Sequence, residues 1–164
     1  MKMIIIFDTD ILSAFAKIEA LPLLKTLFSK HEIYITPEIY GELNVPIDYG
    51  YTFPLDIFKN FKVINPDNEE QETYRTFLRT NRRIGKGELE AISICISRKW
   101  IFSSMDEVAI SFALANGVIT ISLHSILRSL WESGILTKNE VEEIILKIEQ
   151  KDNTRIRDIQ KILK

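Results

Sequence analysis

The pattern of apolar and polar residues is sharpest at the start of the chain. Residues 3–7 read MIIIF, an apolar run without polar alternation, and such a run predicts a strand buried on both faces, as in the centre of a parallel sheet. Asp8, Thr9 and Asp10 follow at once, and residues 9–16 have the spacing of a helix. A carboxylate between a central strand and a helix lies where open α/β sheets bind their ligands. The alternative is that Asp8 or Thr9 only caps the helix.

Strand-like and helix-like segments then alternate along the chain. Apolar, β-rich segments predict strands at 32–36, 61–64, 100–104 and 118–122. Helical spacing predicts helices at 21–28, 37–43, 67–83, 88–98 and 106–115, and mainly helical structure from 124 onward. Residues 44–58 mix Pro and Gly with aromatic residues and predict a loop or short insertion. This order predicts an α/β fold whose parallel strands end at one common edge.

The last thirty or so residues predict a helical tail. Thr137 and Glu140 have the spacing of a capping box, and an apolar stripe follows from Val141 to Ile148. Residues 156–163 predict a last amphipathic helix. By default the tail packs on its own domain; alternatively it presents an apolar face to a partner or a second subunit.

Composition limits the class of protein. The chain has 164 residues, 46% of them hydrophobic, enough for one sizeable core. Its net charge of −2 argues against a protein that coats nucleic acid nonspecifically. The one cysteine, Cys95, cannot form an internal disulfide, and no segment has the pattern of a signal peptide or a membrane span, so we expect a reduced thiol in a cytoplasmic protein. His31 and His124 show no ligand-like spacing, and we expect both to be structural.

Carboxylates collect at the predicted strand ends and helix starts. The candidates are Asp8, Asp10, Glu42, Glu88, Glu90, Asp106 and Glu107. Without Cys or His beside them, carboxylates select Mg²⁺ or Mn²⁺ and not Zn²⁺. Such ions bring a phosphodiester and an activated water together. The helix dipole explains Glu38 and one of Glu88 and Glu90, but it does not require both of that pair.

Two further features have open alternatives. The basic residues Arg75, Arg79, Arg82, Arg83 and Lys86 follow acidic residues along one predicted helix. They either complement the helix dipole or form a stripe that contacts phosphates. Tyr49, Tyr51 and Phe53 either anchor their loop to the core or stack on bases.

Four segments together resemble a known family. IIIFDTDIL, TPEIYGEL, GKGELEAISIC and FSSMDEVAISFALANGVI, in this order, are similar to PIN-domain nucleases, which include the VapC-type toxins of toxin–antitoxin pairs. The C-terminal stretch from WESGILTKNEVEEIIL through RIRDIQKIL resembles the helical tail of a PIN subgroup close to those toxins. The resemblance implies a three-layer, Rossmann-like PIN fold. One domain would span residues 1–164, with a core of about 1–135 and a helical extension of about 136–164.

The resemblance also implies an activity and a site. It implies a Mg²⁺- or Mn²⁺-dependent ribonuclease that holds one or two ions through four acids: Asp8, Glu42, Glu88 and Asp106. Thr9 and Ser104 match the small hydroxyl positions, Asp10 stands where the family often has Asn, and Glu90 competes with Glu88 as the third acid. An RNA substrate, an antitoxin protein and a homodimer are the implied partners.

Two rival functions stay open. Residues 7–10, FDTD, also resemble the start of haloacid-dehalogenase-type phosphatases, in which the first Asp is the nucleophile. That family needs an acidic pair after a late strand, whereas Leu123, His124 and Ser125 follow the last predicted strand. The second rival is a noncatalytic PIN-like scaffold that binds RNA or protein.

Overall fold

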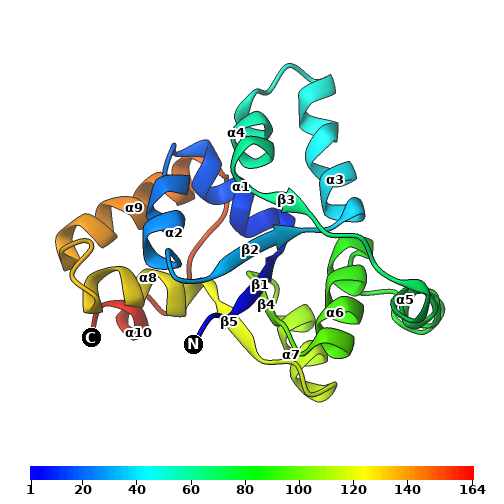
Figure 1. The fold of residues 1–164 in the computed structure, drawn as a ribbon. Coiled ribbons are helices and arrows are strands. Elements are labelled where there is room, and N and C mark those ends of the chain that lie inside the picture. The colour runs from blue at the N-terminus through cyan, green and yellow to red at the C-terminus, as the bar shows by residue number, and fades with distance from the viewer.

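The centre of the molecule is a five-stranded parallel sheet in the order β3-β2-β1-β4-β5 (Figure 1). The computed structural model describes all residues 1–164. The strands are β1 (Ile4–Phe7), β2 (Glu32–Ile35), β3 (Lys62–Val63), β4 (Ile101–Ser104) and β5 (Thr120–Ser122). Ile5 of β1 pairs with Ile33 of β2 on one side and with Ile101 of β4 on the other. The predicted α/β class and the central position of the first strand are therefore confirmed.

The strand order reverses at β1. The chain moves outward from β1 to β2 and β3, and then returns to β4 and β5 on the other side of β1. This reversal leaves a crevice beyond the carboxyl ends of β1 and β4, the usual place for ligands in open α/β sheets. Asp8 and Asp106 follow these two strands.

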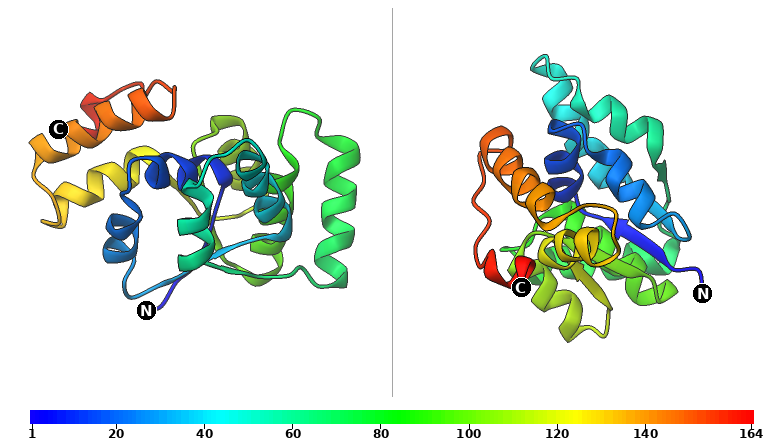
Figure 2. Two further views of the ribbon diagram at one scale, coloured as in Figure 1. Left: turned by 90° about the horizontal axis from the view of Figure 1, so that it is seen from above. Right: turned by 90° about the vertical axis from the view of Figure 1, so that its left-hand side faces the viewer.

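Helices cover both faces of the sheet, which gives the three predicted layers. On one side lie α1 (Thr9–Lys17), α2 (Leu21–Leu27), α8 (Leu123–Glu132) and α9 (Lys138–Lys151). On the other lie α6 (Lys86–Arg98) and α7 (Glu107–Ala115), and α5 (Asn68–Thr80) packs on the outer side of α6, as the left view of Figure 2 shows. Residues 5–7 are fully buried between these layers.

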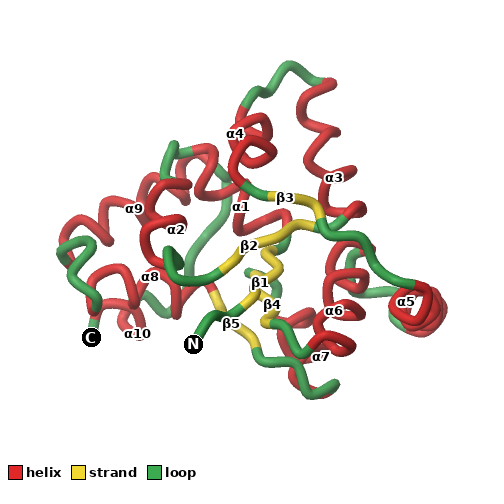
Figure 3. Tube along the Cα trace, in the orientation of Figure 1, coloured by secondary structure: helices red, strands yellow, loops and turns green.

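The prediction of a loop or short insertion at residues 44–58 is wrong. Figure 3 shows two helices here, α3 (Pro37–Asp48) and α4 (Phe53–Asn60), joined by the short connection 49–52. Pro54 lies in the first turn of α4, where a helix tolerates proline, and Pro46 lies inside α3. Ile57 is completely buried and holds α4 to the core. Proline and glycine in this segment hid the helical spacing.

The C-terminal tail packs on its own domain. Val141, Ile145 and Ile148 of α9 are buried, and the capping box of Thr137 and Glu140 is confirmed. The last helix, α10 (Gln160–Leu163), is shorter than predicted. Asn153 and Asp158 have φ values of 51° and 53°, and this left-handed backbone interrupts the helix.

Hydrogen bonds hold the C-terminal tail against the rest of the domain, and both histidines bond to backbone groups. The indole N–H of Trp131 donates to the carbonyl of Ile162 at 2.6 Å. His124 Nε2 lies 2.5 Å from the carbonyl oxygen of Arg157, and Nδ1 of His31 accepts the amide of Met3 at 2.9 Å. Both histidines are structural, as predicted.

Cys95 is 1% exposed and belongs to the core, where burial raises the pKa of its thiol. None of the helices is long and apolar enough to cross a membrane.

Candidate active site

Asp8 lies at the carboxyl end of β1 and is only 3% exposed. Its Oδ1 accepts the amide of Thr9 at 2.6 Å and so caps α1. Its Oδ2 accepts the hydroxyl of Ser104 at 3.0 Å. The capping role considered from the sequence is thus real, but it uses one oxygen and leaves the other facing the end of β4.

Ser104, the last residue of β4, joins three elements. Besides Asp8, its Oγ lies 3.2 Å from Oε2 of Glu88, the third residue of α6. The same Oγ accepts the amide of Asp106 at 3.0 Å. A serine hydroxyl has one hydrogen, so it can donate to Asp8 or to Glu88 but not to both at once. Two carboxylates therefore share one proton donor.

Glu42 approaches the same edge of the sheet from α3. Its Oε2 accepts the hydroxyl of Thr9 at 2.5 Å, and its Oε1 accepts the amide of Gly87 at 3.1 Å. A Cβ at position 87 would lie 2.6 Å from Glu42 Oε1, so only glycine allows this contact without displacing the carboxylate. Gly87 lies inside α6, which begins at Lys86, earlier than the predicted start at Glu88. The contact between Gly87 and Glu42 was not predicted, although the sequence has a glycine directly before Glu88.

Asp106 completes the group from the start of α7. It caps that helix: its Oδ1 accepts the amides of Val108 and Ala109 at 2.8 and 3.4 Å. It is half-buried, and its negative charge is felt at Glu88. Asp8, Glu42, Glu88 and Asp106, together called the acidic cluster below, thus meet at the crevice from four separate elements. Glu107 is exposed on the first turn of α7.

Glu88 and Glu90 are separated by the fold. Glu88 faces Asp8 through Ser104 and also accepts the amide of Gly85 at 3.3 Å. Glu90 is 5% exposed, and its Oε1 accepts the amide of Glu38 at 2.9 Å at the start of α3. Glu90 therefore ties α6 to α3, whereas Glu88 belongs to the acidic cluster.

Negative charge is uncompensated in the acidic cluster. Burial, and then the charge of Glu88, raise the pKa of Asp8 well above its usual range. Burial and the charge of Asp106 raise the pKa of Glu88 to about 7. Lost hydration and the charge of Asp152 raise the pKa of Asp10, which keeps an exposed outer side. None of the ion pairs in the structure includes a member of the cluster.

The donor atoms of the cluster suit a hard cation. No three His, Cys, Asp or Glu side chains are arranged in the structure to hold a metal ion; Asp8 and Glu88 meet at Ser104, while Thr9 and Gly87 hold Glu42. All donors are oxygens, the type that Mg²⁺ and Mn²⁺ prefer. Asp8 and Glu88, which meet at Ser104, are the pair that could bind such an ion, and the ion would supply the positive charge that Ser104 alone does not.

The basic residues are divided between α5 and the connection that follows it. Arg75 pairs with Glu72 on the same helix, and Arg79 Nη2 lies 3.4 Å from the hydroxyl of Thr76. Arg82 and Arg83 are exposed beyond the end of α5, and Lys86 is exposed at the start of α6. These residues do not form one continuous stripe on a helix; only Arg75 and Lys86 border a common pocket.

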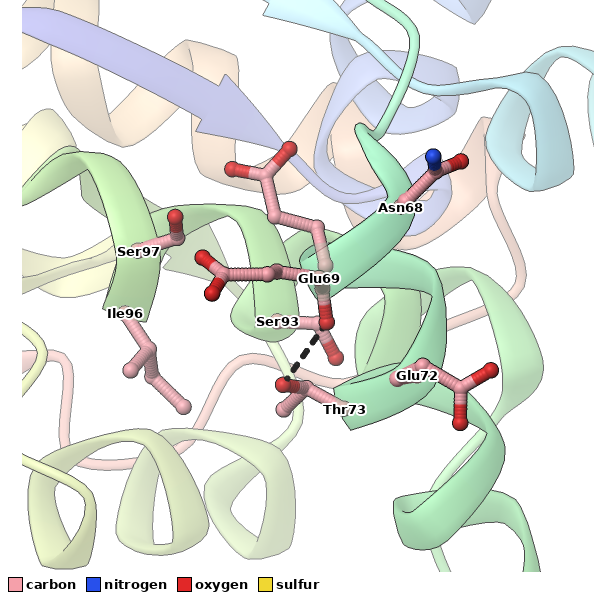
Figure 4. A pocket seen from close by; sticks show the side chains of 8 residues that line it. Asn68, Glu69, Glu72, Thr73, Ser93, Ile96 and Ser97 are labelled. Carbon is pink, nitrogen blue, oxygen red and sulfur yellow. Dashed lines mark hydrogen bonds between the residues drawn. The ribbon is translucent and has the colours of Figure 1, made fainter.

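A separate hollow of about 640 Å³ lies between α5 and α6. Figure 4 shows Glu69 and Glu72 from α5 and Ser93 and Ser97 from α6 around it, with the Thr73 hydroxyl bonded to the carbonyl of Glu69 at 3.1 Å. No residue of the acidic cluster lines this hollow. Its walls belong to the packing of the two helices.

Comparison with known proteins places the chain in a family. A family model described as a PIN domain matches residues 4–163. The chain belongs to the PIN-domain family. A search of curated proteins gives no match. Among solved structures, VapBC2 from Rickettsia felis, bound to a DNA fragment from its promoter, has 19% identity to this PIN domain and a TM-score of 0.57. VapBC-1 from nontypeable Haemophilus influenzae has 15% identity and a TM-score of 0.54.

Both structural neighbours share the fold. Each alignment covers 73% of this chain and 98% of the neighbour. The predicted relation to PIN domains is confirmed. PIN domains are in general nucleases, so membership favours a nuclease over the phosphatase considered from residues 7–10.

Proposed function

We propose that this PIN domain is a Mg²⁺- or Mn²⁺-dependent endoribonuclease. One observation carries the proposal: Asp8 and Glu88, buried or half-buried at the switch point of the sheet, share the single hydroxyl hydrogen of Ser104 and have no cationic side chain beside them. A nuclease that binds a divalent cation needs such an arrangement. A protein that only needed stability would pair or remove these charges.

The chain's own residues have distinct tasks in this proposal. Asp8 and Glu88 provide oxygen ligands, and Asp106 adds negative charge from the start of α7. Thr9 and Gly87 fix both oxygens of Glu42, so its carboxylate is oriented before any substrate binds. When bound, the cation would lower the pKa of a water and stabilise charge on the phosphodiester. Lys86, exposed two residues before Glu88, and Arg75, exposed at the pocket that both residues border, would contact phosphates.

The partners belong to the proposal as well. Two structural neighbours are toxin–antitoxin complexes, and we propose that this chain is likewise the toxin of such a pair, acts as a homodimer and is blocked by an antitoxin protein. Light scattering coupled to size-exclusion chromatography tests the dimer. Co-expression with the product of a neighbouring reading frame, followed by co-purification, tests the antitoxin.

Cleavage of end-labelled single-stranded RNA tests the activity. Wild type, Asp8→Asn and Asp106→Asn are compared in Mg²⁺, Mn²⁺ and EDTA, with Glu69→Gln, an exposed acid outside the cluster, as the control. We expect wild type and the control to cleave only with metal, and both Asp variants to lose at least about 100-fold in rate. Hydrolysis of a phosphomonoester instead of RNA would favour the phosphatase. No cleavage of any RNA would favour the noncatalytic scaffold.

A further inference from the structure

A second pocket, of about 600 Å³, lies between α3, α5 and α6. Gln71, Tyr74 and Arg75 line it from one face of α5, Glu38 from α3, and Lys86 and Glu90 from α6. Its volume lies in the range of small-molecule sites. Of these residues, only Arg75 and Lys86 have a role in the proposed cleavage.

Helix α3 connects the pocket with the acidic cluster. Glu38 and Glu42 are four residues apart on α3, and residues with this spacing lie on the same helix face one turn apart. On α6, Lys86 and Glu90 are one turn apart and line the pocket, whereas Glu88, two residues from each, points to the other side of the helix, toward Ser104. In accord with this proximity, the pKa of Tyr74 is raised by burial and then by the charges of Glu38, Glu90 and, more weakly, Glu42. A nucleotide next to the cleaved phosphate would reach this pocket.

The polar groups of the pocket are not equivalent. Glu90 is buried and already accepts the amide of Glu38 at 2.9 Å, so it forms part of the floor. The carboxylate of Glu38 itself is half-buried and faces the half-buried phenol of Tyr74. Arg75 and Lys86 are exposed at the rim. The pocket thus combines an acceptor pair inside, an aromatic ring in the wall and positive charge outside.

This combination selects a class of ligand. Acidic residues in the interior disfavour a free anion, and Arg75 and Lys86 at the rim disfavour a bare metal ion. A nucleotide satisfies both: its phosphates meet the rim, its base stacks on Tyr74, and its edge faces a carboxylate. Guanine is the base that offers two adjacent N–H donors to a carboxylate, whereas uracil offers one N–H between two carbonyls.

We propose that this pocket binds the base of the nucleotide next to the cleaved phosphodiester, and that Glu38 selects guanine. The inference rests on the proposed ribonuclease function for its biological meaning. The binding itself requires no cleavage. Glu38 and Tyr74 would therefore set the sequence preference of the enzyme, while the acidic cluster carries out the reaction.

Fluorescence anisotropy in EDTA tests the binding. The probes are labelled hexaribonucleotides: oligo(U), and oligo(U) with one guanine, one adenine or one inosine, which lacks the 2-amino group. We expect wild type to bind the guanine probe at least about tenfold more tightly than the uracil and adenine probes, with inosine between them. Equal affinity for all four probes would overturn the proposal.

Variants assign the preference to its residues. Glu38→Gln keeps the backbone amide that Glu90 binds, and it should equalise the four probes; Glu69→Gln, an exposed acid of α5, should keep the guanine preference. Tyr74→Ala should weaken binding to every probe, whereas Tyr74→Phe should retain stacking. A guanine preference that survives Glu38→Gln would overturn the assignment. Melting curves confirm that each variant is folded.

The outcomes separate this inference from the function on which it rests. Guanine-selective binding without any RNA cleavage would support the pocket and contradict the nuclease. Metal-dependent cleavage without base preference, unchanged by Glu38→Gln, would support the nuclease and contradict the pocket.

Discussion

Buried or half-buried carboxylates lie at both ends of α6, in opposite surroundings. Near the C-terminal end of α6, Nε and Nη2 of Arg98 each donate a hydrogen bond of 2.8 Å to the fully buried carboxylate of Glu70 from α5. Glu70 also accepts the amide of Asp67 at 2.8 Å. Burial opposes its ionisation, but the bonds from Arg98 and Asp67 outweigh burial and lower the pKa of Glu70.

At the N-terminal end of α6, Glu88 and Asp8 have no such partner. One serine hydroxyl lies between them, and burial together with neighbouring carboxylates raises the pKa of both. The same fold thus satisfies one buried acid with a bidentate arginine and leaves a group of others without a cation. Unsatisfied charge of this kind costs stability and is typical of functional sites.

Breaking the ion pair between Arg98 and Glu70 should have the largest effect on stability. Arg98→Ala leaves the buried Glu70 carboxylate without its cation, and we expect a loss of about 3–5 kcal/mol in the free energy of unfolding by urea denaturation. The double variant Arg98→Met/Glu70→Gln, which removes the uncompensated charge, should recover much of this loss. A loss below about 1 kcal/mol for Arg98→Ala would show that Glu70 does not depend on the pair.

Removing a charge from the acidic cluster should stabilise the metal-free protein. Asp8→Asn eliminates a buried carboxylate whose pKa is raised, so the metal-free variant should be more stable than wild type at pH 7.5. We expect a gain of about 1 kcal/mol, or roughly 2–4 °C in Tm, by calorimetry in EDTA. Destabilisation of similar size would mean that Asp8 serves the fold as a helix cap more than the site.

The two glutamates should also differ in their dependence on pH. Glu88 has a pKa of about 7 against an ordinary 4.5, so its ionisation destabilises the fold progressively as pH rises from about 5 to 7. The advantage of Glu88→Gln over wild type in EDTA should therefore grow across this window, to about 1 kcal/mol after allowance for partial exposure. Glu70 has a lowered pKa, so its contribution should be full above 4.5 and decline in more acidic solution. Parallel pH profiles for Glu88→Gln and Glu70→Gln would contradict the contrast.

The smallest effect on stability is expected at Gly87. In Gly87→Ala the new Cβ would displace the carboxylate of Glu42 and would lie 3.1 Å from Cγ1 of the buried Ile39. Alanine favours a helix by about 1 kcal/mol over glycine, and this gain offsets the crowding, so the net change in stability should stay within about 1 kcal/mol. Metal-dependent RNA cleavage should nevertheless fall at least about tenfold, because Glu42 loses its orientation. Gly41→Ala, with open space at its Cβ, is the matched control and should keep its activity. Full activity of Gly87→Ala would remove the Gly87 amide from the account.

Much of the fold follows from local patterns in the sequence. The apolar run at residues 4–7 marked the central strand, and Asp8 and Asp106 were predicted as site residues because Asp8 directly follows one strand and Asp106 lies two residues after another. Residues 44–58 were misjudged because Pro54 occurs in the first turn of α4, where helices tolerate proline, and because α3 continues past Pro46 although proline is unfavourable inside a helix. Contacts between distant elements could not be predicted from the sequence either. The hydrogen bond from the Gly87 amide to Glu42 and the bond between Glu90 and α3 depend on how α6 packs against α3. The choice between Glu88 and Glu90 required the true start of α6.

Titration of Mn²⁺ into the metal-free protein tests the central claim most directly. The claim is that the acidic cluster lacks a cation from the protein because it binds one from solution. Isothermal calorimetry at pH 7.5 should show saturable binding to wild type and to Glu69→Gln, and affinity at least about tenfold weaker for Asp8→Asn and Glu88→Gln. Absence of binding to wild type, or equal affinity in all four proteins, would contradict the account.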